Sequence, residues 1–164
     1  MTAQEDTPGF YTQEAFEQRC AALASMVATY WQADLIVGLE TGGAYVAAQL
    51  KTLLRVRHMV VLDVVNEDGN YRLGSTVRLN PDLVVGRHVL CVDDSFYRGG
   101  LLAELHDVVV SMGGLPLQAA IARIRGPREL QSSPNMVFVD ELPCGAGGRP
   151  CHPNWPWKRL KPVV

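Results

Sequence analysis

Short apolar runs recur along this chain, and segments with helical spacing of apolar residues separate them. The apolar runs are residues 34–38, 59–65, 88–92, 117–124 and 136–142. The amphipathic segments are residues 12–31, 43–54 and 100–112, the first with Thr12 as its expected N-cap. Strands that are apolar on both faces are typical of parallel sheets, because crossover helices cover both faces. The sequence therefore predicts an α/β fold with an open, mostly parallel sheet flanked by helices.

Length and composition favour a single domain. The chain has 164 residues, of which 48% are hydrophobic and 20% charged, and this balance is sufficient for one buried core. We expect residues 1–10 to form a flexible tail and residues 11–164 one domain. The polar, glycine-containing stretch at about 66–75 predicts a mobile lid loop. Prolines and tryptophans near the C-terminus predict a small hood over about residues 136–164.

Charge, hydropathy and cysteine content argue against several classes of protein. The formal net charge of −2 provides no general basic field for nucleic acid. No apolar run reaches the length of a membrane span, and the first ten residues are acidic and polar, unlike a signal peptide. We therefore expect a cytoplasmic protein without membrane or nucleic-acid partners. In that compartment we expect reduced thiols at Cys20, Cys91, Cys144 and Cys151.

A glycine-rich turn, Gly38-Leu-Glu-Thr-Gly-Gly43, follows the first predicted strand. In open parallel sheets, ligands bind beyond the carboxyl ends of the strands. Glycines let the backbone approach a ligand there, and the helix that follows offers free N–H groups to a phosphate. A plain tight turn would use the same glycines, so the turn alone does not establish an anion site.

Two adjacent acids, Asp93 and Asp94, follow the apolar run 88–92 and precede a loop and a predicted helix. Adjacent carboxylates repel each other and cannot both be buried without partners. A pair of diol hydroxyls, a divalent cation or an arginine could compensate them. In the alternative interpretation, one carboxylate caps the helix and the other faces water.

The succession of strand, paired acids, loop, glycine and helix resembles the phosphoribosyl pyrophosphate (PRPP) motif of the type I phosphoribosyltransferases. Other segments follow in the order of that family. The turn 38–43 resembles the pyrophosphate loop, the stretch 66–75 the flexible catalytic loop, and Asn154-Trp-Pro-Trp-Lys158 the ending of the small 6-oxopurine (xanthine-guanine/hypoxanthine) branch. The resemblance extends over about residues 12–160. It implies the family's fold, Mg²⁺ as cofactor and a homodimer.

The resemblance also implies an activity, the transfer of the 5-phosphoribosyl group of PRPP to a planar, purine-like nitrogen base with release of pyrophosphate. Asp93 and Asp94 would hold the ribose hydroxyls and contact Mg²⁺ only through PRPP. Tyr97, which stands where many purine enzymes have an acidic residue, would be the third catalytic residue. The residues expected to bind the phosphate and pyrophosphate of PRPP are Glu40, Thr41, Gly42, Gly43, Ser95, Phe96, Arg98, Gly99 and Gly100.

Four residues are candidates for contacts with the base. Arg123 and Arg125 lie at the end of a predicted strand where 6-oxopurine enzymes place a basic residue, although a solvated basic turn would look the same. His152 and Trp155 could stack on a planar base, since such a contact needs only a π-face. The alternative for a tryptophan here is a place in the core.

The chain departs from the family pattern in both anion-binding loops. Arg98-Gly99-Gly100-Leu101 stands where the family has Thr-Gly-x-Thr, so both hydroxyls are absent. Thr41 replaces a common basic residue, and Glu40 adds a negative charge. A guanidinium can bind a phosphate through two N–H groups, so we expect Arg98 to contact the 5′-phosphate. Two other functions stay open: a PRPP- or nucleotide-binding regulatory protein, and an enzyme of this fold for a specialised base or another phosphosugar.

Overall fold

A five-stranded parallel sheet forms the centre of the molecule, in the order β2-β1-β5-β6-β7. The computed structural model describes residues 11–74, 79–97, 100–125, 136–143 and 153–159. The strands are β1 (Leu35–Leu39), β2 (His58–Leu62), β5 (His88–Phe96), β6 (Leu115–Ile124) and β7 (Met136–Leu142). This architecture confirms the predicted α/β fold with a mostly parallel sheet.

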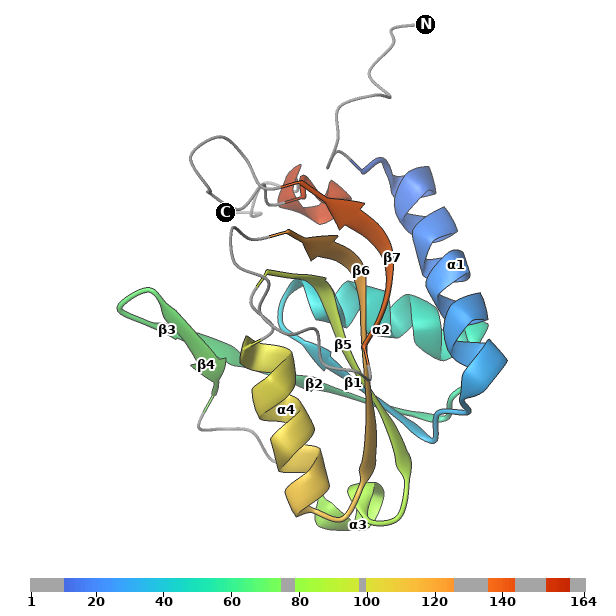
Figure 1. Cartoon of the computed structure of the whole chain (residues 1–164), viewed down its shortest axis with the longest axis vertical. Helices are drawn as coiled ribbons and strands as arrows, with labels where there is room; N and C mark the ends of the chain where they lie inside the picture. Colours follow the sequence, from blue (N-terminus) through green and yellow to red (C-terminus); the bar gives the residue numbers. More distant parts are fainter. Residues whose placement is uncertain (1–10, 75–78, 98–99, 126–135, 144–152, 160–164) are drawn as a thin grey trace, which may run out of the picture.

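Helices cover both faces of the sheet (Figure 1). The helices are α1 (Gln13–Tyr30), α2 (Gly42–Leu53), α3 (Pro81–Val84) and α4 (Gly100–Ser111). Successive strand residues alternate between two cores: Ile36 packs with α1 and α2, and Leu35 and Val37 pack with α3 and α4. Thr12 is the N-cap of α1, as expected, and its side chain accepts a hydrogen bond from the Ala15 N–H at 3.1 Å.

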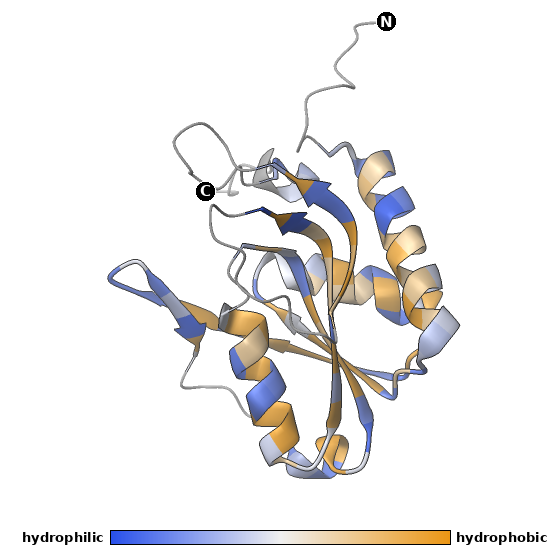
Figure 2. Cartoon of the chain, viewed as in Figure 1, coloured by the Kyte–Doolittle hydropathy of each residue, from blue (hydrophilic) through white to orange (hydrophobic). Residues whose placement is uncertain are grey.

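Hydrophobic and hydrophilic residues are unevenly distributed over this fold (Figure 2). The central strands and the helix faces turned toward them are hydrophobic, whereas the ends of β6 and β7 and the tip of a hairpin beside α4 are hydrophilic.

Among the described residues, no helix is long and apolar enough to cross a membrane. Cys20 and Cys91 are buried free thiols, and burial raises the pKa of each to about 12. Cys144 and Cys151 lie outside the described residues.

The segment predicted as a lid loop is a regular antiparallel hairpin over most of its length. Its strands are β3 (Val64–Glu67) and β4 (Asn70–Leu73), and it projects from the sheet beside α4 (Figure 1). The prediction of one apolar strand over 59–65 was therefore wrong at its end, because residues from Val64 onward pair with β4 and not with the main sheet. Ser75 lies outside the described residues. Closure of the segment over a ligand stays a prediction.

The described part of the expected hood packs against α1 and α2 through aromatic rings. Tyr11, Trp155, Trp157 and Tyr45 form a continuous stack with neighbouring ring centroids 4.4, 5.2 and 4.7 Å apart. The backbone N–H of Tyr11 also donates to the carbonyl of Asn154 at 3.2 Å. Residues 136–142, which the sequence predicted as an apolar strand and which we also counted as the start of the hood, form β7 of the main sheet. The expected tail, residues 1–10, lies outside the described residues.

Candidate functional site

The paired acids and the glycine-rich turn meet where β1 and β5 end. A Cβ atom built on Gly42 would lie 1.9 Å from Oδ2 of Asp94. One built on Gly43 would lie 2.6 Å from the carbonyl oxygen of Val92 and 3.0 Å from Cα of Asp93. Only glycines allow the start of α2 to lie this close to β5. The structure thus brings together Gly42, Gly43, Asp93 and Asp94, as the sequence predicted.

Asp93 and Asp94 lie within β5 and not in a loop after it. Their strand continues to Phe96, because Ser95 and Phe96 still pair with Ala122 and Arg123 of β6. The predicted strand end at residue 92 was therefore too early. The longer strand holds the backbone of both acids, and that of Ser95 and Phe96, in a fixed register.

The position of Asp93 is electrostatically unfavourable for its charged carboxylate. The Asp94 N–H donates to Oδ1 of Asp93 at 2.8 Å, and Ser95 Oγ donates to Oδ1 of Asp94 at 3.0 Å. Burial, and then the negative charge of Asp94, raise the pKa of Asp93 well above its ordinary value. A ligand that donates hydrogen bonds, or brings positive charge, would compensate this site.

The turn before α2 has two exposed residues, Glu40 and Thr41, joined by a cis peptide bond. The Glu40 N–H donates to the carbonyl of Leu62 at 3.0 Å, which ties this turn to the end of β2. Thr41 makes no side-chain cap bond to α2, so the first N–H groups of this helix are not satisfied by its N-cap side chain.

The two candidate arginines of β6 have partners on β7. The Arg123 guanidinium lies over the ring of Phe138, with Cζ 5.5 Å from the ring centroid. The Arg125 Nε donates to Glu141, and this bond lowers the pKa of the Glu141 carboxyl. Sequence reasoning missed Phe138 and Glu141, because only the assembled sheet brings β7 beside β6 and its side chains within reach of these arginines.

Trp155 is a core residue. It is 0% exposed and lies between the rings of Tyr11 and Trp157, with Phe16 at its edge. The prediction that Trp155 stacks on a base was therefore wrong, and its alternative, a place in the core, is the one observed. Tyr97, after β5, and Gly100, at the start of α4, are within the described residues. Arg98 and Gly99, together with His152, lie outside the described residues.

No family model and no curated protein sequence match this chain. Solved structures do. A purine phosphoribosyltransferase from Pyrococcus horikoshii Ot3 has a TM-score of 0.72 at 21% identity, over 94% of this chain and 96% of that one. A hypothetical protein from Neisseria gonorrhoeae with bound ppGpp has a TM-score of 0.73 at 14% identity, over 96% and 93%. The xanthine-guanine-hypoxanthine phosphoribosyltransferase of Helicobacter pylori has a TM-score of 0.64 at 14% identity, over 80% and 85%.

Proposed function

We propose, from the type I phosphoribosyltransferase fold that these similarities show, that the chain transfers the 5-phosphoribosyl group of PRPP to a planar, purine-like nitrogen base and releases pyrophosphate. One observation carries this proposal. Asp93 and Asp94 lie directly against the glycine turn that starts α2, so groups suited to a ribose and to a diphosphate are side by side. At these levels of identity, the solved structures support the fold and leave the substrate to be tested.

The proposed roles follow from the chemistry of each group. The carboxylates of Asp93 and Asp94 would accept hydrogen bonds from the two ribose hydroxyls, which would replace part of the hydration lost by burial. The N–H groups at the start of α2 and of α4 would bind the pyrophosphate and the 5′-phosphate. A base nitrogen would then attack the anomeric carbon while the bond from that carbon to the pyrophosphate oxygen breaks. The protein would mainly orient the reactants and exclude water.

Mg²⁺ fits this site as part of the ligand. The described residues hold no group of three or more side chains able to bind a metal by themselves. Asp93 and Asp94 nevertheless supply carboxylate oxygens of the kind Mg²⁺ prefers, and Asp93 would be relieved by nearby positive charge. When bound with PRPP, the metal would neutralise charge on the leaving pyrophosphate. The two aspartates would contact the metal only through PRPP.

We place the base at the ends of β5, β6 and β7. Tyr97 follows β5 there, and Arg123 and Arg125 lie on and just after β6. Arg123 would contact an exocyclic oxygen of the base. The ring of Phe138, over which the Arg123 guanidinium lies, would hold it in position for this contact. Arg125 already pairs with Glu141, so these two side chains would take part in base recognition together.

The direct test is turnover. The protein is incubated with Mg²⁺, PRPP and single bases from a purine and pyrimidine panel, and pyrophosphate and the nucleotide product are both measured. The proposal expects equal amounts of the two products with one base class. Absence of turnover with every base, together with tight binding of PRPP, would replace the proposal by the second candidate.

That second candidate is a regulatory protein that binds PRPP or a nucleotide with little or no catalysis. It is supported by the similar structure that carries ppGpp, and by the loss of both cradle hydroxyls in Arg98-Gly99-Gly100-Leu101. Calorimetric titration with PRPP, ppGpp and nucleoside monophosphates distinguishes the two functions, because a regulator should bind at least one of them without consuming it. An enzyme of this fold for another phosphosugar would bind PRPP weakly and show turnover only with that sugar.

Arg98→Ala should weaken the binding of PRPP by about 1.5–3 kcal/mol, the usual range for hydrogen bonds to charged groups. Arg98 is the only cationic residue in a loop that lacks the family's two hydroxyls, so the proposal gives it the 5′-phosphate. Arg98→Thr should restore part of the loss, because Leu101 still lacks a hydroxyl. Arg87→Ala, at the opposite end of β5, is the control. Equal PRPP affinities of Arg98→Ala and Arg87→Ala would contradict the role of Arg98.

Hydrogen exchange should slow in residues 66–74 when PRPP and Mg²⁺ are added. The hairpin would close over the site and shield the anomeric carbon from water. Mass spectrometry of proteolytic peptides measures the change, and residues 31–34, at the other end of the sheet, should exchange at the same rate with and without ligand. Unchanged exchange in 66–74 at saturating PRPP would show that the hairpin is not a lid.

A further inference from the structure

Tyr11, just before α1, contacts two segments that lie near the other end of the chain. Its hydroxyl donates to Oδ2 of Asp140 on β7 at 2.5 Å. Its backbone N–H donates to the carbonyl of Asn154 at 3.2 Å, and its ring stacks on Trp155 with the centroids 4.4 Å apart. Tyr11 itself is buried. This one residue therefore joins the end of β7 to the chain segment that begins at residue 153.

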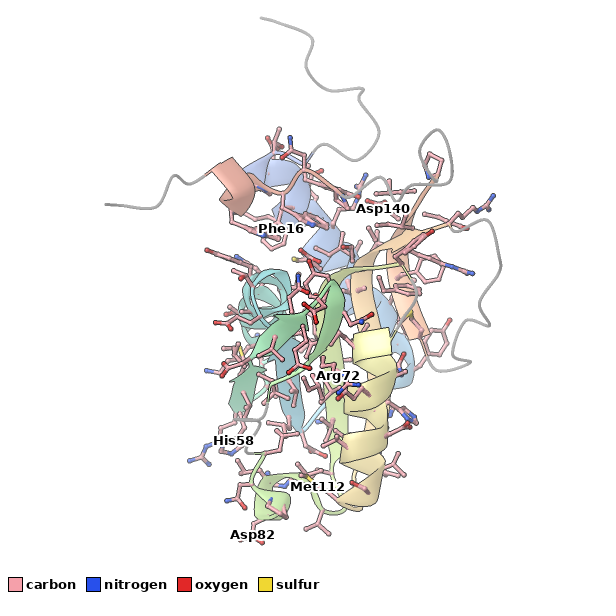
Figure 3. All side chains as sticks on the ribbon, turned by 90° about the vertical axis from the view of Figure 1, so that its left-hand side faces the viewer. Phe16, His58, Arg72, Asp82, Met112 and Asp140 are labelled. Atoms are coloured by element: carbon pink, nitrogen blue, oxygen red, sulfur yellow. The ribbon has the colours of Figure 1, made fainter. Side chains whose placement is uncertain are left out.

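Asp140 also connects this junction to α1. The same Oδ2 atom accepts a second hydrogen bond, from Nε of Arg19 on α1 at 2.8 Å. Burial, and then the hydrogen bond to Asp140, raise the pKa of Tyr11, so its hydroxyl stays protonated and remains a donor. Figure 3 shows Asp140 at the same end of the molecule as Phe16 of α1, whose ring meets Trp155 edge-on. Two donors with a shared, charged acceptor make this a strong contact.

The end of β7 carries groups to which we assign the base. In the described part of the chain, β7 is the last strand on its side of the sheet, and only β6 pairs with its backbone. Glu141 follows Asp140 directly and binds Arg125, and its register partner on β6 is Arg123. Contacts that fix Asp140 therefore also fix the part of β7 from which Glu141 reaches Arg125.

A ligand binds more tightly to a site that is already formed, because a larger fraction of the molecules can then receive it. We propose that Tyr11 is a positioning residue for the base: through Asp140 it holds the end of β7, and with it Glu141, in the arrangement that binds the base. Tyr11 lies outside residues 12–160, over which the family resemblance extends, so no family motif assigns it this role. The role rests on the base position in the proposed function, and it applies whether or not the bound nucleotide is turned over.

Calorimetric titration with ligands that carry or lack a base tests this role. The probes are guanosine, inosine and adenosine 5′-monophosphate, and ribose 5-phosphate, which has no base. Tyr11→Phe keeps the stacked ring and the backbone bond but loses the bond to Asp140. It should weaken the best-bound nucleotide by roughly three- to tenfold, because fewer molecules hold the end of β7 in the binding arrangement, and leave the affinity for ribose 5-phosphate unchanged. Tyr11→Ala, which also removes the stack, should weaken that nucleotide by at least roughly tenfold.

Tyr30→Phe is the matched control, because it removes the same hydroxyl at the other end of α1, where Tyr30 is 84% exposed. It should bind all four ligands as wild type does. Circular dichroism must show each variant folded, and if Tyr11→Ala is not, Tyr11→Phe decides alone.

Three results would overturn the role of Tyr11. They are an unchanged nucleotide affinity in Tyr11→Phe, an equal loss for the nucleotide and for ribose 5-phosphate, and a wild type that binds no nucleotide more tightly than ribose 5-phosphate. Absence of turnover with every base, while nucleotides bind and Tyr11→Phe weakens them alone, would overturn only the proposed catalysis.

Discussion

Asp93→Asn is expected to make the ligand-free protein more stable at neutral pH and to weaken its binding of PRPP by about 10- to 150-fold. The binding loss corresponds to about 1.5–3 kcal/mol for a charged acceptor of ribose hydrogen bonds. Burial and the negative charge of Asp94 make this site unfavourable for a charged side chain. The protein gains stability because Asn carries no charge. The amide oxygen of Asn can still accept the bond from the Asp94 N–H. Opposite effects on stability and binding are typical of a residue placed for a ligand.

The gain in stability should depend on pH. Because the pKa of Asp93 is raised in the folded state, that state binds the proton more tightly than the unfolded chain does. Below the ordinary carboxyl pKa, Asp93 is protonated in both states and costs nothing. As the pH rises through the raised pKa, the folded protein must lose this proton, and the free energy of unfolding of wild type falls relative to Asp93→Asn.

Urea unfolding from pH 3 to 8 measures this difference, and calorimetry with PRPP and Mg²⁺ measures binding. Asp107→Asn is the control, because the Asp107 side chain is 84% exposed and lies away from the site. It should change neither quantity. If Asp93→Asn had the same PRPP affinity and the same pH dependence of stability as Asp107→Asn, the assignment of the site would be wrong.

Gly43→Ala is expected to lower the free energy of unfolding by about 2–3 kcal/mol and to reduce PRPP binding as well. The added Cβ would lie 2.6 Å from the Val92 carbonyl oxygen and 3.0 Å from Cα of Asp93, and both are backbone atoms that cannot rotate away. Relief of this overlap must move α2 away from β5, which costs packing energy. The same movement would separate the pyrophosphate turn from the two acids. For a chain of this length, the melting temperature should fall by about 5–10 °C.

Gly100→Ala provides the comparison for stability. Gly100 starts α4, as Gly42 starts α2, but a Cβ built on it has no heavy atom within 4 Å. Alanine there should leave the melting temperature unchanged or raise it slightly, because it lowers the entropy of the unfolded chain. Equal melting temperatures for Gly43→Ala and Gly100→Ala would show that α2 can yield without cost.

Local patterns in the sequence determined the elements of this fold and the place of its candidate site. Apolar run 136–142 coincides with β7, and Thr12 caps α1 as predicted. The expected neighbourhood of Asp93 and the glycine turn also followed from the sequence, because the carboxyl ends of neighbouring parallel strands meet at one edge of a sheet. These features depend on contacts within one element or on a general rule of topology.

Tertiary structure alone decided the features that depend on pairing between distant segments. β5 continues past residue 92 because β6 offers it partners, and residues 64–73 form a hairpin because Val64–Glu67 pair with Asn70–Leu73. By its chemistry, Trp155 could either stack on a base or fill the core. Only the position of Tyr11, from the other end of the chain, shows that Trp155 fills the core. Arg125 meets Glu141 because β6 and β7 pair side by side, although the register itself sets Glu141 opposite Arg123. The spacing of buried residues can be recognised within the sequence of each segment. The partners of a residue on neighbouring strands are fixed only when the whole sheet is assembled.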